Sequence, residues 1–324
     1  MKEALFYVKL ESKKVKCNLC PHSCTISDGQ SGICMIRKNI DGNLMQTAYG
    51  EISSINIDPI EKKPLYHFYP NSRILSIGTN GCSLNCEYCQ NYTISKNITV
   101  RQKISSEDLL ALAQRYNSIG LAYTYNEPTI WYEFVYDTAT LFHENNLKNV
   151  LVTNGYINPE PLKQIIPYID AANIDLKGFS EEKYKKLGGG LKPVMDTIEV
   201  MFSNRIHIEL THLAVEGYTT NLKEFEEMCK WIASLCKEIP LHISQYFPCY
   251  LLNLPPTRQE YLRTLFDIAK KYLHYVYLGN IPIENDTFCP YCGKKLVERN
   301  GYNVKLYISD NTCPSCKRSL YFLL

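Results

Sequence analysis

The sequence has few features of a membrane or secreted protein. None of its apolar runs approaches the roughly 20 residues that span a bilayer. Its polar start, Met1-Lys2-Glu3-Ala4, does not resemble a signal peptide. An excess of either charge is also missing, because 35 basic residues face 33 acidic ones and leave a net charge of +2. This balance argues against a protein that coats a polyanion, and we expect a cytoplasmic protein with no membrane partner.

Cysteine, by contrast, is abundant, with 14 among 324 residues. A chain of this length with 45% hydrophobic residues can bury a substantial core. A disulfide scaffold, which is typical of short secreted chains, is therefore not expected. Eleven of the cysteines fall in three groups, within residues 17–34, 82–89 and 289–316. Such grouping is typical of metal ligands in a reducing compartment.

The central group follows a strand-like run at 73–77 and consists of Cys82, Cys86 and Cys89. Thiolates at this spacing can ligate three corners of a cubane iron–sulfur cluster. The fourth iron then has no protein ligand and is open to a small molecule, which indicates a reactive cluster. A loop of reduced cysteines or half of a zinc site is the weaker reading, because thiolates at metal-ligand spacing seldom occur without a metal.

The N-terminal group has a compact spacing that is typical of a four-thiolate site. It contains Cys17, Cys20, Cys24 and Cys34. Such a site can hold tetrahedral zinc or a second, fully ligated iron–sulfur cluster. We favour zinc slightly, because a closed four-thiolate site can support a small fold that has little core of its own.

The C-terminal group has two Cys-x-x-Cys knuckles separated by a strand-rich interval. Its members are Cys289, Cys292, Cys313 and Cys316. This pattern predicts a zinc ribbon or a rubredoxin-like module, with iron as the competing occupant. Basic side chains outnumber acidic ones around it and could meet phosphate, although short basic faces are usually only solvated.

Between these end groups the chain alternates strands and helices, which predicts an α/β fold with a parallel sheet. About six βα units follow Arg73, too few for an eightfold barrel. We therefore expect a partial, TIM-like (β/α)6 barrel at 71–281. A strand-containing N-terminal metal module would occupy 1–70, and the C-terminal module 282–324.

Polar side chains stand where the predicted strands end. They are Asn126, Glu127, Thr153, Asn154, Asp175, Lys177 and Gln245. Ligands of open α/β sheets bind at the carboxyl ends of the strands, so these residues are candidates for one site. A carboxylate there suits a ligand ammonium, and a lysine suits a ligand carboxylate. Simple solvation of loop ends is the alternative for any one of them.

The motif Cys82-x-x-x-Cys86-x-Tyr88-Cys89, with an aromatic residue before its last cysteine, resembles the signature of radical S-adenosylmethionine (SAM) enzymes. Further stretches extend the likeness over nearly the whole chain: Cys17 to Cys24, Asp58 to Phe68, Ser76 to Thr79, Cys89 to Asn91, Tyr123 to Thr129 and the C-terminal ribbon. Together they resemble the AmmeMemoRadiSam-system radical SAM enzymes, relatives of the pyruvate formate-lyase activating enzymes.

This resemblance implies a [4Fe–4S] cluster that reductively cleaves SAM to a 5′-deoxyadenosyl radical, which abstracts hydrogen from a macromolecule. A protein is the preferred substrate, RNA is an alternative, and a noncatalytic metal-binding adaptor is a third possibility. Ferredoxin or flavodoxin would supply electrons, and Memo-like and Ammecr-like proteins would be candidate partners.

The resemblance also implies roles for single residues. Glu127 would hold the SAM ammonium, with Asn126 where a glycine is usual. Thr153 and Asn154 would face the ribose, while Asp175 and Lys177 would lie near the SAM carboxylate and ribose. Tyr88 and Gln245 are further cofactor-binding candidates.

One departure from the family pattern follows the sixth predicted strand. Phe247-Pro248-Cys249 stands where a histidine, a proline and an acid are expected. The chain therefore lacks that histidine, and Cys249 becomes a candidate extra thiol near the site. Unpaired cysteines are, however, most often simply buried.

Overall fold

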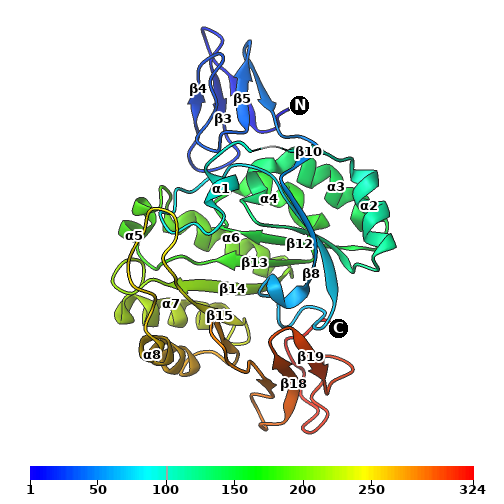
Figure 1. Ribbon diagram of the computed structural model, residues 1–324, viewed down its shortest axis with the longest axis vertical. Coiled ribbons are helices and arrows are strands. Elements are labelled where there is room, and N and C mark those ends of the chain that lie inside the picture. The colour runs from blue at the N-terminus through cyan, green and yellow to red at the C-terminus, as the bar shows by residue number, and fades with distance from the viewer. Residues whose placement is uncertain (100) are drawn as a thin grey trace.

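The fold is built on an eight-stranded sheet, which crosses the middle of the molecule (Figure 1). The computed structural model describes residues 1–99 and 101–324. The strand order is β16-β15-β14-β13-β12-β11-β9-β8. In chain order the strands are β8 (Ser54–Pro59), β9 (Arg73–Gly78), β11 (Gly120–Tyr123), β12 (Lys148–Thr153), β13 (Ala171–Asp175), β14 (His207–Ala214), β15 (Leu241–Gln245) and β16 (Val276–Gly279). All neighbours pair in parallel except β8, which pairs antiparallel with β9. The predicted α/β partial barrel is thus confirmed.

A helix connects each parallel strand to the next. The six connecting helices are α2 (Ser106–Arg115), α3 (Tyr132–Glu144), α4 (Pro159–Ile165), α6 (Leu191–Ser203), α7 (Leu222–Leu235) and α8 (Gln259–Lys270). Shorter turns are α1 (Tyr92–Ser95), α5 (Glu181–Lys186), η1 (Ile60–Lys62), η2 (Pro128–Trp131) and η3 (Ile166–Tyr168). Helix α2 begins with a capping box, in which the Ser105 hydroxyl accepts from Asp108 N and the Asp108 carboxylate accepts in return.

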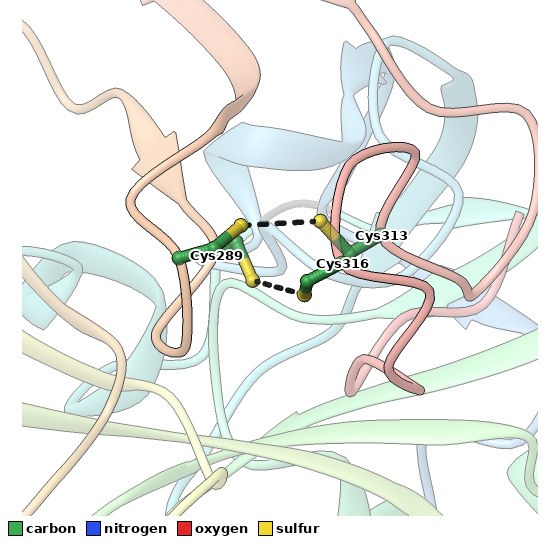
Figure 2. A group of neighbouring side chains, drawn as sticks. Cys289, Cys313 and Cys316 are labelled. Carbon is green, nitrogen blue, oxygen red and sulfur yellow. Dashed lines mark hydrogen bonds between the residues drawn. The ribbon is translucent and has the colours of Figure 1, made fainter.

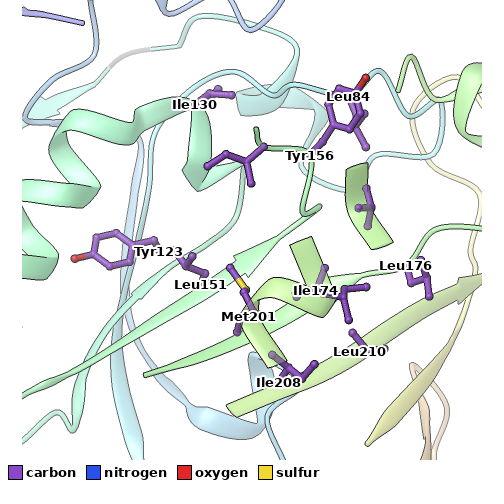
Figure 3. Packing of buried hydrophobic residues seen from close by; sticks show 14 of the residues in the cluster. Leu84, Tyr123, Ile130, Leu151, Tyr156, Ile174, Leu176, Met201, Ile208 and Leu210 are labelled. Atoms are coloured by element: carbon purple, nitrogen blue, oxygen red, sulfur yellow. The ribbon is translucent and has the colours of Figure 1, made fainter. Parts of the chain in front are cut away.

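The core fills the space between the sheet and these helices (Figure 3). Leu151, Ile174 and Ile208 from three neighbouring strands are all less than 2% exposed, as is Met201 from α6. Strands covered on both faces must be apolar along most of their length. This explains why the sequence signal for these strands is a continuous apolar run.

The N-terminal module is a pair of small antiparallel sheets at the top of Figure 1. One contains β1 (Lys2–Glu3), β5 (Arg37–Ile40) and β6 (Asn43–Gln46), and the other β2 (Tyr7–Lys9), β3 (Val15–Cys17) and β4 (Thr25–Ile26). A further pair joins β7 (Glu51–Ile52) to β10 (Gln102–Lys103). Since β8 belongs to the large sheet, the boundary that the sequence places at residue 70 falls between the first two strands of that sheet.

The C-terminal module lies at the opposite end of the molecule (Figure 1). It consists of β17 (Thr287–Phe288), β18 (Lys295–Asn300) and β19 (Asn303–Leu306) around a small apolar core of its own. Its tail covers the amino ends of the barrel strands, where Leu323 N donates to His67 O at 2.9 Å and the Tyr321 hydroxyl lies 3.2 Å from Ile208 N. Arg299 also reaches across, donating to Tyr66 O at 2.7 Å.

A buried carboxylate organises the amino ends of the strands. Glu209 on β14 is fully buried and accepts from His67 N and His242 Nε2, both at 2.7 Å. His207 Nε2 lies 3.2 Å from the same carboxylate. These contacts hold the segment that contains His67 against the barrel.

None of the helices in the described residues combines the length and the apolar character that a membrane span requires.

We expect the free energy of unfolding to fall as the pH drops from about 6.5 toward 4. Burial lowers the pKa of His67 to about 3 and that of His212 to about 4. Because an unfolded histidine titrates near 6.5, the unfolded state binds more protons in this range, and stability is lost on acidification. Each histidine contributes up to about 1.4 kcal/mol per pH unit.

Denaturant titrations of the wild type and His212→Gln at several pH values between about 5 and 7 measure this effect. The amide retains hydrogen-bonding groups for Leu176 O and the Thr220 hydroxyl, which His212 contacts at 2.8 Å each. Acid loss of bound metals affects both proteins equally, so the difference between them isolates the histidine. Identical pH slopes for the two proteins would contradict the prediction.

Candidate functional site

The three central cysteines lie on the loop that leaves the carboxyl end of β9. The chain turns away from the sheet at Gly78, where a Cβ would come within 2.6 Å of Thr124 O on the adjacent segment. Only glycine fits such an approach. Cys82, Cys86 and Cys89 then follow on one irregular loop that ends at α1. The structure therefore places all three thiols at the sheet edge where ligands of this fold class bind.

Asn126 holds this loop in place. Its Oδ1 accepts from Thr79 N at 3.0 Å, and its Nδ2 donates to Gly81 O at 3.0 Å. Asn91, on the far side of the cysteines, donates to Tyr125 O at 2.7 Å. Both amides therefore fasten the cysteine loop to the end of β11. Asn126, predicted to contact the cofactor, is engaged with the backbone of the loop.

The environment of the thiols suits metal-bound thiolates. Leu84 N points at Cys82 Sγ from 3.4 Å, and the Ser95 hydroxyl lies 3.0 Å from Cys89 Sγ. Burial raises the pKa of Cys82 to about 12 and also raises that of Cys86. Buried thiols of this kind are neutral when metal-free, and metal binding deprotonates them.

Two buried polar atoms beside the thiols lack a protein partner within the described residues. They are the Tyr88 hydroxyl and Asn80 Oδ1. Buried polar groups normally have a hydrogen-bond partner, which here would come from a ligand or water. Three thiols on one loop, with two unpartnered polar atoms on the same segment, fit a cluster that has one open iron.

Glu127 is a junction between two strand ends. It is 3% exposed, and its Oε1 accepts from the Thr153 hydroxyl at 2.7 Å while Oε2 accepts from Asn154 N at 2.8 Å. Thr129 adds two further donors to Oε1. Burial raises the pKa of Glu127, and these hydrogen bonds oppose that shift. Four donors occupy much of the carboxylate, so Oε2 offers the remaining lone pair for a ligand ammonium.

Thr153 and Asn154 both hold Glu127, and Asn154 also supports the cysteine loop. Asn154 Nδ2 donates to the Ser83 hydroxyl at 3.0 Å and lies 3.7 Å from Cys82 Sγ. Thr153 is engaged with Glu127 and with Gly155 N. The structure thus brings the end of β12 into contact with the first cysteine.

Asp175 and Lys177 form an ion pair at the end of β13. Lys177 Nζ lies 2.7 Å from Asp175 Oδ2, and the lysine side chain is 17% exposed. Burial acts to lower the pKa of Lys177, but the charge of Asp175, and that of Cys86 when it is a thiolate, outweigh it and raise the pKa well above its usual value. Lys177 therefore carries a fixed positive charge beside the cysteine loop.

Gln245 is turned away from this group. Its Nε2 donates to Thr257 O at 2.7 Å, which anchors the far end of the loop that follows β15. The same loop folds back over the cysteines, where Leu251 N and Leu252 N donate to Glu87 O at 2.9 and 3.0 Å. Cys249 Sγ lies 3.6 Å from Cys89 O. The extra thiol is therefore close to the three-cysteine loop, against the backbone of Cys89.

A buried charged cluster lies against Tyr125. Asp58 accepts from Lys63 Nζ and from the Tyr125 hydroxyl, both at 2.7 Å, and from Lys62 Nζ at 2.9 Å. These hydrogen bonds lower the pKa of Asp58 below its usual range, although burial acts to raise it. Asp58 and Lys63 are 4% and 2% exposed, so at these two positions the polar segment is buried and does not form a surface connection. Their position beside Tyr125, which precedes Asn126, was not predictable because it depends on how β8 pairs.

The four C-terminal cysteines form a compact group (Figure 2). Their sulfur atoms all lie within 4.8 Å of one another, with Cys289 to Cys316 and Cys292 to Cys313 at 3.6 Å each. Sulfur atoms at these distances fit a tetrahedral four-thiolate site. This group can therefore hold a single metal ion, far from the three-cysteine loop.

The fold and the three-cysteine loop define a class of protein that the comparisons also identify. The profile of the radical SAM superfamily matches residues 76–232. The structure of Streptococcus suis SuiB bound to S-adenosylmethionine superposes with a TM-score of 0.51 at 14% identity, over 64% of this chain and 51% of SuiB. The chain belongs to the radical SAM superfamily, whose fold implies SAM and a [4Fe–4S] cluster.

Among individual proteins, the chain is similar to MJ0808 of Methanocaldococcus jannaschii, at 41% identity over 98% of this chain and 97% of that protein. A second protein of that organism, MJ1227, carries the provisional name of a glycyl-radical enzyme activating enzyme. It is 26% identical over 68% of this chain and 93% of its own length. The 4-hydroxyphenylacetate decarboxylase activating enzyme of Clostridium scatologenes is 24% identical over 31% of this chain and 36% of its own length.

Proposed function

We propose that this protein is a radical SAM enzyme that cleaves SAM reductively and abstracts hydrogen from a macromolecule, most simply another protein. The observation that carries the proposal is the meeting of Cys82, Cys86 and Cys89 with the ends of β11, β12 and β13 at one sheet edge. We further propose that it belongs to the AmmeMemoRadiSam group, with Memo-like and Ammecr-like proteins as partners. A ferredoxin or flavodoxin would supply electrons, and zinc would occupy the C-terminal site.

The residues of this chain have separate tasks in that reaction. When bound, the cluster and SAM supply the 5′-deoxyadenosyl radical. Cys82, Cys86 and Cys89 would hold the cluster and leave one iron open, while Asn126 and Asn154 keep their loop in register. Glu127 and Lys177 would bind the two charges of the SAM amino acid group, an ammonium and a carboxylate.

The rim of the site favours a macromolecular substrate. Apolar side chains that are more than a third exposed surround the cysteine loop: Tyr92, Phe247, Tyr250, Leu251 and Leu254. Tyr92 and Tyr250 stack with ring centroids 4.9 Å apart, which links the rim to α1. Exposed apolar groups gathered around one site are typical of surfaces that meet another protein. The activating-enzyme names of two relatives support the same substrate class.

RNA modification is less well supported, because the basic C-terminal ribbon covers the amino ends of the strands, at the opposite end of the barrel from the cysteine loop. An RNA bound to the ribbon would not be placed at the site by that contact alone. The two substrates differ in a measurable way. Steeply salt-dependent RNA binding would favour RNA, since phosphate contacts release counterions.

The proposal is tested by turnover of the reconstituted protein under anaerobic conditions. With dithionite as reductant, we expect SAM to be converted to 5′-deoxyadenosine and methionine, detected by chromatography and mass spectrometry. Extract from cells that lack the enzyme then serves as substrate source, and proteins that change in mass identify the target. A fully loaded cluster that cleaves no SAM would overturn the proposal and favour a noncatalytic adaptor.

Replacing Lys177 with methionine tests the proposed SAM contact. We expect the KM for SAM to rise about 10- to 100-fold, since a charge-assisted hydrogen bond is worth about 1.5–3 kcal/mol. Lys177→Arg keeps the charge and should recover part of the affinity. Iron content should be unchanged in both variants. A KM equal to that of the wild type in Lys177→Met would exclude a contact between this ammonium and SAM.

A further inference from the structure

The four N-terminal cysteines line a single cavity. Apart from the thiols, its walls are largely apolar and include Leu19, Ile26, Ile33 and Ile130. Ile130 comes from the barrel segment η2, so the cavity lies at the contact between the N-terminal module and the barrel. Ser83, next to Cys82 in the chain, also lines it.

The spacing of the sulfur atoms distinguishes this group from the C-terminal one. A zinc ion with Zn–S bonds of about 2.3 Å requires sulfur atoms about 3.8 Å apart. The four C-terminal sulfur atoms all lie within 4.8 Å of one another, which is close to this requirement. In residues 1–99 and 101–324, no three of the N-terminal sulfur atoms lie within 4.8 Å of one another, and the three sulfur atoms of the active-site loop do not either. In a [4Fe–4S] cluster each thiolate binds a different iron, and in a [2Fe–2S] cluster two pairs of thiolates bind different irons, so in neither case do three thiolate sulfurs lie as close together as on one ion.

Arg37 supplies an independent sign of an anionic occupant. Arg37 lines the cavity and is 1% exposed. Nη1 donates to Glu133 at 2.9 Å and Nη2 to Leu5 O, but Nε has no partner within the described part of the chain. A buried N–H without a partner is costly. Thiolate or sulfide sulfur in the cavity would supply the missing acceptor.

Only a thin wall separates this cavity from the active-site loop. A Cβ on Gly81 would lie 2.2 Å from Cys34 O, so a backbone carbonyl of the N-terminal group is packed against the residue before Cys82. His22, between two of the N-terminal cysteines, lies with Nε2 2.7 Å from Ser83 O. Both cysteine groups thus border the same few residues, Gly81 to Ser83.

We propose that Cys17, Cys20, Cys24 and Cys34 bind a second iron–sulfur cluster, and that it passes single electrons to the cluster of the active-site loop. A one-electron donor of the ferredoxin or flavodoxin class reduces the N-terminal cluster. That electron then moves to the active-site cluster, so the N-terminal cluster returns to its oxidised state and no atom is transferred. The relay rests on the proposed function, whereas the presence of the second cluster does not.

The first experiment removes the active-site ligands and leaves the N-terminal group intact. The full chain carrying Cys82→Ala, Cys86→Ala and Cys89→Ala is reconstituted anaerobically, and iron, zinc and acid-labile sulfide are measured. We expect about two to four irons with matching sulfide to remain. Sulfide is the decisive readout, because neither zinc nor rubredoxin-type iron brings any. Zinc without sulfide in this variant would overturn the proposal.

Two further variants assign the retained metal. Adding Cys20→Ser and Cys24→Ser should remove the remaining iron and sulfide, while adding Cys292→Ser should leave them unchanged and remove only the C-terminal ion. If the first of these variants does not fold, the sulfide count of the parent variant still decides. Retention of sulfide after Cys20→Ser and Cys24→Ser in a folded protein would place the cluster elsewhere and overturn the assignment.

The relay is tested by electron paramagnetic resonance of dithionite-reduced protein. Two reduced clusters that border the same residues couple magnetically. The wild-type spectrum should therefore differ from the sum of two spectra, that of the active-site variant and that of a Cys20→Ser/Cys24→Ser variant that keeps Cys82, Cys86 and Cys89. A spectrum equal to that sum would overturn the relay. If the wild type cleaves no SAM but the active-site variant retains sulfide, the proposed function fails and the second cluster stands. If the wild type cleaves SAM but the active-site variant retains no sulfide, the proposed function stands and the second cluster is overturned.

Discussion

Cys86→Ala will abolish the reductive cleavage of SAM, with a loss of at least about 1,000-fold, or about 4 kcal/mol in the barrier. Cys86 is 7% exposed and is the middle cysteine of a loop with three thiols. Removing it leaves two ligands for a cluster that needs three. Lys177, whose raised pKa depends partly on Cys86, would also lose a neighbour that balances its charge.

Cys249→Ala is the matched control for this variant. It removes a thiol that lies against Cys89 O, and therefore tests whether the loss of any cysteine near the site abolishes SAM cleavage. We expect iron content to stay at the wild-type value and SAM cleavage to change by no more than about threefold, or about 0.7 kcal/mol. Product formation by anaerobic, reconstituted Cys86→Ala at the wild-type rate would show that the three-cysteine loop is not the reactive centre.

The sheet and the location of the site were predictable because both follow from local patterns. Buried parallel strands produce apolar runs, and amphipathic helices between them produce a second period, so strands such as β12 and helices such as α7 are visible in the sequence. The rule that ligands bind at carboxyl ends then selected Glu127, Asn154 and Lys177 without knowledge of their contacts. The structure places all three beside the cysteine loop.

The partners of those residues were not predictable, because they lie far away in the chain. Asn126 reads as a cofactor contact in the sequence, yet it clamps Thr79 and Gly81, more than forty positions away. Gln245 stands at a strand end and still turns toward Thr257. No local pattern reports such contacts, since they depend on the register between β9, β11 and the loops above them.

The pairing of β8 was missed for the same reason. Its residues alternate like those of a small edge strand, and nothing in the sequence states whether that strand joins the N-terminal module or the barrel. Antiparallel pairing with β9 over its whole length brings Asp58 beneath Tyr125. A polar segment that looks like a surface connection thereby becomes part of the barrel interior.

Arg37→Met will lower the free energy of unfolding by about 3–5 kcal/mol, the cost of leaving one partner of a buried ion pair uncompensated. Arg37 and Glu133 have side chains that are 1% and 0% exposed, and they join the N-terminal module to α3. After the change, Leu5 N at 2.8 Å is the one remaining hydrogen-bond donor to the Glu133 side chain among the described residues. Denaturant titration followed by circular dichroism measures the loss, and a variant within about 1 kcal/mol of the wild type would contradict it.

The double variant Arg37→Met/Glu133→Leu separates charge from packing. Replacing both members of a buried ion pair by apolar groups of similar size is often neutral, so most of the lost stability should return. Because the double variant folds but offers no guanidinium to the cavity, it also isolates the effect of Arg37 on the four N-terminal cysteines. We expect the midpoint potential of a cluster held there to become more negative, since a buried positive charge favours the reduced, more negative state. Restored stability with an unchanged potential would show that Arg37 serves only to join the module to the barrel.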